Sequence, residues 1–205
     1  MTADWFRNTD WSATIEAEFN ENLSRARRKE QYLRIQASTL ARTNPEVALR
    51  LLDRYFELPD NFDHAQAHVD RAAAFLALMR IDDALDSYED ALARESEFPK
   101  LRTEAYLELP FQIAVLRLRN RYARALEVLR TNQSRLMFPV DHFRWHAAMA
   151  LIAAHLGQPD ARVHAERALE ASARDKSGFR YHPSVGLVGD RYDEIIQQLA
   201  SHVAA

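Results

Sequence analysis

The chain has 205 residues, with 27 basic and 30 acidic side chains and a formal net charge of −3. This balance gives no reason to expect binding to nucleic acid or to an anionic membrane. The sequence contains no cysteine, which excludes disulfides, thiolate metal sites and cysteine nucleophiles. Hydrophobic residues make up 47% of the chain and only four glycines occur, so the composition favours a helical globular protein over one built from β-hairpins.

The N-terminus lacks the basic segment followed by an apolar stretch that marks a secretory signal. The most apolar run, residues 147–156, is interrupted by His155. It is much shorter than the stretch of about 20 apolar residues that crosses a bilayer. We therefore expect a soluble, cytoplasmic protein that makes no membrane contact.

Apolar residues recur at intervals of three and four along nearly the whole chain, which is the period of an amphipathic helix. Near the N-terminus, Ile15 and Phe19 begin one such stripe, with Thr9 or Asp10 as the candidate N-cap. Pro45 follows a break in the pattern and suits the first position of a new helix. The remaining helices are predicted over residues 29–42, 45–58, 65–80, 84–95, 101–119, 123–131, 142–156, 161–173 and 190–203.

The predicted helices fall into pairs that repeat along the chain. The second helix of each pair carries a small residue in register, which permits close approach of two helices. One pair departs from the pattern, because Pro110 lies inside its first helix and should kink it or mark the start of a separate helix. Helix pairs repeated at this period are typical of an α-solenoid. The small residues in register, at intervals of 36, 41 and 36 residues, are Ala48, Ala84, Ala125 and Ala161.

One segment, residues 81–92 (IDDALDSYEDAL), resembles a tetratricopeptide (TPR) repeat in the order of its small, aromatic and small residues. Tyr32 and Trp145 occupy the large position of the first helix in two other repeats. The resemblance covers about residues 29–173. It implies an all-α fold, an α-solenoid of antiparallel helix pairs whose concave surface binds a partner. The first-helix glycine of the family is replaced here by Gln36, Ala72, Ile113 and Met149.

The chain is expected to have three parts. Residues 1–28 form an N-terminal aromatic segment and helix, residues 29–173 form about four TPR-like helix pairs, and residues 174–205 form a Gly- and Pro-containing loop with a C-terminal capping helix. Caps are needed because the end repeats of a solenoid would otherwise expose apolar surface. The two flanks also resemble those of a group of bacterial TPR-like proteins, a resemblance that implies no activity.

The concave face of such an array is lined by the first helix of each pair. Its lining would be small and apolar with a few arginines, which suits a peptide with apolar anchors and an acidic group. Some of these positions could instead pack against the flanking segments. The predicted groove residues are Leu33, Arg34, Ala37, Val69, Asp70, Arg71, Ala73, Ala114, Arg117, Arg144, His146 and Ala150.

The stretch 176–190 contains Pro183 and three glycines, which predicts a structured loop. Phe179, Tyr181 and His182 lie within it. Their side chains either form a docking surface for a partner, as ordered loops often do, or cover the end of the array.

Candidate chemical sites are sparse. His64 and His68 lie four residues apart, as do His142 and His146, a spacing at which two imidazoles can share a metal ion. Neither pair has an HExxH glutamate or an evident third ligand, and there is no Gly-rich phosphate loop or nucleophile elbow. We expect no enzyme activity, no metal and no cofactor. A basic run is interpreted as solvated surface; it comprises Arg117, Arg119, Arg121 and Arg124.

These features favour a scaffold or adaptor that binds a protein or peptide in the concave groove. One alternative is an inhibitory, immunity or regulatory partner of a single target protein. Another is a small-molecule sensor or enzyme that uses the groove His and Arg residues, which is disfavoured because no nucleophile–base or metal signature is present. Self-association of two copies stays open, since exposed apolar ends could pair.

Overall fold

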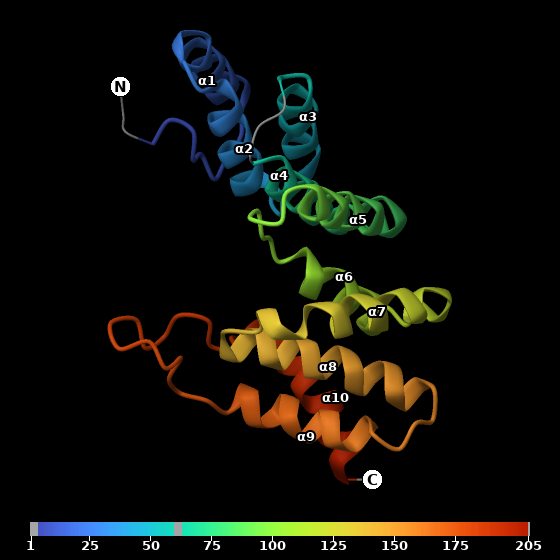
Figure 1. Ribbon diagram of the computed structural model, residues 1–205. Helices are drawn as coiled ribbons and strands as arrows, with labels where there is room; N and C mark the ends of the chain where they lie inside the picture. Colours follow the sequence, from blue (N-terminus) through green and yellow to red (C-terminus); the bar gives the residue numbers. More distant parts are fainter. Residues whose placement is uncertain (1–3, 60–62, 205) are drawn as a thin grey trace. The chain divides into compact units, whose positions relative to one another are not determined.

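The computed structural model describes residues 4–59 and 63–204, and within these ranges all regular structure is helical (Figure 1). The all-α class is therefore confirmed. No helix within these ranges is long and apolar enough to cross a membrane. The α-helices are α1 (Ala13–Arg25), α2 (Lys29–Leu40), α3 (Pro45–Phe56), α4 (His64–Ala77), α5 (Ile81–Glu97), α6 (Ala105–Val115), α7 (Tyr122–Asn132), α8 (Pro139–His155), α9 (Ala161–Ser172) and α10 (Asp193–Ala204), with short 3₁₀ turns η1 (Arg119–Arg121), η2 (Gln133–Arg135) and η3 (Asp190–Tyr192).

The chain divides into two compact units, Met1–Ala105 and Tyr106–Ala205. The boundary falls inside the predicted repeat region 29–173, and the three-part organisation expected from the sequence stays a prediction. The two units are described separately below.

In the first unit, α2 packs against α3, α4 packs against α5, and α4 also contacts α2 and α3. The core between them is built from buried side chains of α2 and α3, including Leu33, Leu52 and Tyr55. Ala48 and Ala84, two of the small residues predicted to permit close helix approach, are fully buried. The apolar stripes that predicted these helices are thus the faces that they bury against one another.

The aromatic N-terminal segment packs on α1 and α2. The Trp5 ring lies against Phe19 of α1 and Tyr32 of α2, with ring centroids 5.4 and 4.8 Å apart. Fully buried Gln36 holds the segment in place. Its Oε1 accepts hydrogen bonds from the backbone N–H and the Nδ2 of Asn8, both at 3.0 Å, and its Nε2 donates to the Asn8 carbonyl at 2.8 Å. The side-chain amide of Gln36 therefore fixes the N-terminal segment on α2.

The second unit is organised around α8, which packs against α7, α9 and α10. Twelve of the 17 residues of α8 are buried, since the helix is apolar on most sides. Trp145 of α8 donates its Nε1–H to the Leu129 carbonyl of α7 at 3.0 Å. Ala125 of α7 is fully buried, whereas Ala161 at the start of α9 is half-buried. The C-terminal helix α10 also contacts α9, so it covers apolar surface of this unit.

Three helices end in the same way. Met79, Arg117 and Gly157 follow α4, α6 and α8 in left-handed backbone conformations, with φ of 57°, 55° and 66°. In each turn the next N–H donates to a carbonyl of the last helical turn: Arg80 to Phe75 at 2.9 Å, Leu118 to Ile113 at 3.0 Å, and Gln158 to Ala153 at 2.8 Å. This is the Schellman motif. A shared turn geometry thus recurs in both units, although only one of the three turns uses glycine.

Several predicted boundaries are wrong. The expected turn at 81–83 is the first turn of α5, where Asp82 and Asp83 interact favourably with the helix dipole. The expected helix 101–119 begins at Ala105, because buried Glu95 accepts hydrogen bonds from the backbone N–H and hydroxyl of Thr103 at 2.7 and 2.6 Å. Ser12, rather than Thr9 or Asp10, caps α1.

The first helix of the fourth predicted pair starts at Pro139 in place of residue 142, since proline suits the first helical turn. Pro110 lies within α6 and starts no separate helix.

Candidate functional site

The predicted groove residues of the first unit lie on α2 and α4. Arg34 of α2 places Nη1 3.1 Å from Asp70 Oδ2 and Nε 3.6 Å from Asp63 Oδ2. Asp70 also accepts hydrogen bonds from the Ser38 hydroxyl at 3.1 Å and from Gln66 Nε2 at 3.2 Å. Burial raises the pKa of Asp70, while the Arg34 charge and these hydrogen bonds lower it. The Arg34 charge is therefore balanced within the protein.

Arg71 is likewise bound by its own chain. Its Nη2 lies 3.0 Å from Asp53 Oδ1 of α3, and its guanidinium lies over the Phe56 and Phe75 rings at 5.3 and 5.7 Å. A peptide carboxylate at either arginine would have to compete with an aspartate that is already in place. Both arginines are thus already paired with an aspartate, so neither is available to the acidic group expected of a groove ligand.

The other predicted groove residues divide by burial. Val69, Ala73 and His146 are half-buried, and Arg117 is exposed. Five side chains are buried and belong to the helix cores, namely Leu33, Ala37, Ala114, Arg144 and Ala150. A partner can touch only the first group without rearrangement of the core. The use of any of these residues in binding stays a prediction.

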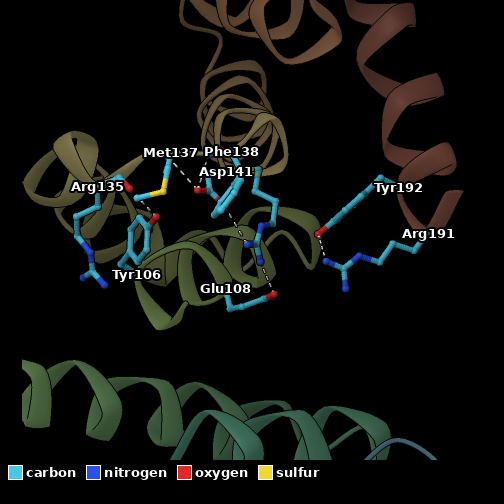
Figure 2. A network of polar contacts seen from close by, with 9 residues as sticks. Tyr106, Glu108, Arg135, Met137, Phe138, Asp141, Arg191 and Tyr192 are labelled. Carbon is cyan, nitrogen blue, oxygen red and sulfur yellow. Dashed lines mark hydrogen bonds and ion pairs between the residues drawn. The ribbon is translucent and has the colours of Figure 1, made fainter. Parts of the chain in front are cut away.

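Arg144 is the centre of a buried ionic network that joins α6 to the start of α8 (Figure 2). It is 1% exposed. Its Nη1 lies 2.6 Å from Glu108 Oε1, and its Nη2 lies 3.7 Å from Asp141 Oδ1. The other oxygen of Asp141 accepts the backbone N–H groups of Met137 and Phe138 at 3.1 and 3.0 Å, which caps α8. The network joins α6 to α8 and fixes the residue at which α8 begins.

Tyr192 of η3 lies beside this network, with Arg191 Nη2 donating to its hydroxyl at 2.7 Å (Figure 2). Burial raises the pKa of Tyr192, and the charges of Arg144 and Arg191 lower it. Its ring packs on Phe111 of α6 and Phe143 of α8 at 5.7 and 5.0 Å. The phenol therefore anchors the segment that leads into α10.

One of the spaced histidines contacts a histidine of another helix. His146 of α8 meets His164 of α9, with the two Nδ1 atoms 3.0 Å apart and the Trp145 ring beside both. Burial, and next the His164 charge, lower the pKa of His146 to about 4. At neutral pH the two neutral rings can share one N–H···N hydrogen bond.

Within the described residues, no group of three or more His, Asp or Glu side chains could hold a metal ion. In the first unit, His68 of α4 lies 4.7 Å from the Phe56 ring and 3.6 Å from Asp90 Oδ2. The pKa of His68 is lowered, mainly because the ring is partly buried.

The predicted loop is an ordered structure attached to the start of α8. Ser177 holds its base: the backbone N–H donates to the Pro183 carbonyl and the hydroxyl to the His182 carbonyl, both at 2.8 Å. Near its end, the Gly186 carbonyl accepts the Val140 N–H at 2.8 Å. Phe179 stacks on Phe138, with ring centroids 5.2 Å apart. The loop is therefore fixed both by its own hydrogen bonds and by α8.

This anchored loop exposes a set of large apolar side chains, which we name the loop surface. Tyr181 is 79% exposed, Met137 63%, Val185 46% and Phe179 42%. Of the predicted docking residues, Phe179 and Tyr181 thus lie on it, and His182 is exposed beside them. Sequence reasoning missed Met137 and Val185, because no local pattern shows that α8 and the loop come together.

No protein-family model, curated protein or solved structure matches this chain.

Proposed function

We propose that the chain is a TPR-like helical repeat protein that binds another protein or a peptide, with the loop surface as its docking site. The observation that carries this proposal is the exposure of Tyr181, Phe179 and Val185 on an ordered loop, with exposed Met137 next to Phe138, on which Phe179 stacks. Clustered apolar side chains in water are unfavourable unless a partner covers them, and such clusters often mark interaction sites.

The loop is suited to binding for an energetic reason. Ordering a flexible segment on association costs about 0.5–1.5 kcal/mol for each immobilised side chain. Here the Ser177 hydrogen bonds and the Phe138–Phe179 stack already order the loop. Tyrosine is also among the side chains that contribute most to interfaces. A partner could therefore gain contact area on Tyr181 at reduced entropic cost.

Support for the TPR-like part of the proposal comes from repetition within each unit. The helix pairs α2/α3 and α4/α5 of the first unit and α8/α9 of the second pack together, and the Schellman turn recurs after α4, α6 and α8. Three of the four small residues in register are fully buried at helix contacts. The cytoplasmic location expected from the sequence stays a prediction.

A second candidate surface is the α2/α4 face of the first unit. Val69 and Ala73 are half-buried there, and exposed Ser38 lies beside the Arg34–Asp70 ion pair. Since Arg34 is neutralised, this face fits an apolar peptide better than an acidic one. A protein that inhibits one target would use the same kinds of contact as an adaptor. The two alternatives therefore differ in whether binding changes the activity of the bound protein.

The experiment is affinity capture from a lysate of the source organism with four immobilised proteins. They are the wild type, the loop variant Tyr181→Ser/Val185→Ser, the α2/α4 variant Val69→Glu/Ala73→Glu and the control Val163→Ser. Val163 is a 47% exposed apolar residue of α9 and controls for loss of surface hydrophobicity.

A protein retained by the wild type, the control and the α2/α4 variant, and lost by the loop variant, is the expected result. Loss only with the α2/α4 variant would instead establish the second surface. Equal capture by all four proteins would refute both surfaces. Circular dichroism of each variant checks that the helices are intact.

A further inference from the structure

The basic run of the sequence is divided by the fold. Arg124 pairs with Glu127 along α7 at 2.8 Å. Arg117 and Arg119 instead lie at the turn between α6 and α7, on the same side of the second unit as the C-terminal end of α8 (Figure 1). Both are exposed. Neither guanidinium has a hydrogen bond or ion pair with a described residue.

Tyr122 begins α7 directly after this turn, and it pairs with His155 of α8. The Tyr122 hydroxyl lies 2.7 Å from His155 Nδ1, and the two rings are stacked. We name the set Arg117, Arg119, Tyr122, His155 and His202 the basic corner. When the tyrosine hydroxyl donates to Nδ1, the neutral imidazole carries its proton on Nε2, which is then a further donor.

The electrostatics of the basic corner have one sign. Burial lowers the pKa of His155, and Arg117, Arg119 and His202 lower it further. Burial raises the pKa of Tyr122, which Arg119 and Arg117 oppose. The charges of Arg117 and Arg119 thus act on both members of this Tyr–His pair, in a chain whose formal net charge is −3. An oxyanion placed here would be attracted by the two guanidinium charges.

We propose that the basic corner binds a phosphate-type oxyanion, with Arg117 and Arg119 as its main ligands. Guanidinium groups match the oxygen spacing of such anions and can bind them in a bidentate manner. The N-terminus of α7, which begins at Tyr122, adds the positive end of a helix dipole. Two guanidinium groups and an imidazole suit a multiply charged anion better than one carboxylate.

The position of Arg117 allows a sharp test. Its φ of 55° is one that glycine adopts without strain, so Arg117→Gly removes the guanidinium without disturbing the turn. Met79→Gly is the matched control, because Met79 has a φ of 57° in the equivalent turn of the first unit and carries no charge. Arg119→Gln removes the second guanidinium and leaves the backbone unchanged.

The experiment titrates each protein with pyrophosphate and follows the imidazole signals by NMR, at constant ionic strength set with chloride. Saturable binding to the wild type should raise the pKa of His155, because a nearby anion stabilises the imidazolium form. Met79→Gly should bind like the wild type. Arg117→Gly and Arg119→Gln should each bind at least about tenfold more weakly, the loss of one charge-assisted contact.

Three results would overturn the proposal. They are unchanged affinity in both arginine variants, a His155 shift that chloride alone reproduces, and succinate binding as tightly as pyrophosphate. The last would replace phosphate with carboxylate as the ligand chemistry. His155 ends α8 and the loop surface lies at its start, roughly 24 Å away for a 17-residue helix. A negative result for the basic corner would therefore leave the loop-surface proposal untouched, and the reverse also holds.

Discussion

Single residues decide how the helices of this protein end and how its loop is fixed. At Met79 and Arg117 an L residue adopts a left-handed conformation in which Cβ approaches the following carbonyl, a strain of roughly 1–2 kcal/mol relative to glycine. At Gly186 the reason for glycine is contact: its φ is 70°, and a Cβ there would lie 2.5 Å from Phe138 side-chain atoms. A left-handed conformation is thus tolerated with strain at Met79 and Arg117, whereas contact with Phe138 excludes any side chain at Gly186.

The first prediction concerns the turn after α4. Met79→Gly should raise the free energy of unfolding by about 0.5–1 kcal/mol, since relief of the left-handed strain exceeds the entropy that glycine adds to the unfolded chain. Met79 is 74% exposed, so little packing is lost. Urea denaturation measures the change. The reverse substitution, Gly157→Ala, should lower stability, and a destabilised Met79→Gly would contradict this explanation.

The second prediction concerns the anchor of the loop. Gly186→Ala should detach the loop from α8, because the new Cβ clashes with Phe138 and strains the Gly186–Val140 hydrogen bond. Trypsin should then cleave at Lys176 and Arg180 several-fold faster than in the wild type. Gly189→Ala is the control, since a Cβ at Gly189 meets nothing within 4 Å. Equal cleavage rates in the two variants would show that Gly186 does not hold the loop.

At the scale of helices, the periodicity of three and four predicted each element, because every helix buries one apolar face. Starts and ends were harder to predict, since they depend on contacts between distant residues or on competing local signals. The start of α6 depends on the hydrogen bond from Thr103 to Glu95, which lies eight residues earlier. The start of α5 was misplaced because its acidic residues Asp82 and Asp83 also suit a turn. Gln36 shows most clearly how a distant contact escapes the sequence. The sequence suggested only that Gln36 replaces a repeat glycine, whereas the packed N-terminal segment reveals its hydrogen-bond partner Asn8.

The third prediction tests that contact between the N-terminal segment and α2. Gln36→Ala should lower stability by about 1–3 kcal/mol, because it leaves buried polar groups of Asn8 without hydrogen bonds. The fluorescence of Trp5 and Trp11 should shift to the red as the segment becomes exposed. Thr39→Ala on the same helix serves as a control, since the Thr39 hydroxyl bonds only within α2. An unshifted emission maximum in Gln36→Ala would argue against the anchoring role.

The fourth prediction concerns the α8–α9 contact and pH. The folded-state pKa of His146 is about 4, below its ordinary 6.5, with His164, Arg167 and His142 as the neighbouring charges. Between these values the unfolded chain binds the proton that the folded chain excludes. The contribution of His146 to stability is therefore fully present above pH 6.5 and is lost as pH falls toward 4.

Denaturation midpoints measured between pH 4 and 7 test this. His146→Gln should reduce the loss of stability on acidification without abolishing it, because burial also lowers the pKa of His68, His155 and His164. An identical pH dependence in His146→Gln would exclude His146 as a source of the acid sensitivity.

At the scale of the whole molecule, the all-α class followed from composition and periodicity, whereas the division into two units did not. The loop surface was predicted in part, because Phe179 and Tyr181 are conspicuous in a Gly- and Pro-containing stretch. Met137 and Val185 belong to it because Phe179 stacks on Phe138 and Gly186 bonds to Val140, which only the fold shows. The internal pairing of Arg34, Arg71 and Arg144 also required the structure, since their aspartate and glutamate partners lie on other helices.

The loop surface is exposed and already ordered, and we expect it to bind a protein partner. The most direct test is the dissociation constant of the captured partner for the wild type and for Tyr181→Ala, measured by isothermal titration calorimetry. Loss of a central tyrosine contact worth at least 2 kcal/mol predicts a dissociation constant about 30-fold higher, with an unchanged unfolding midpoint. Equal dissociation constants for the two proteins would contradict the claim.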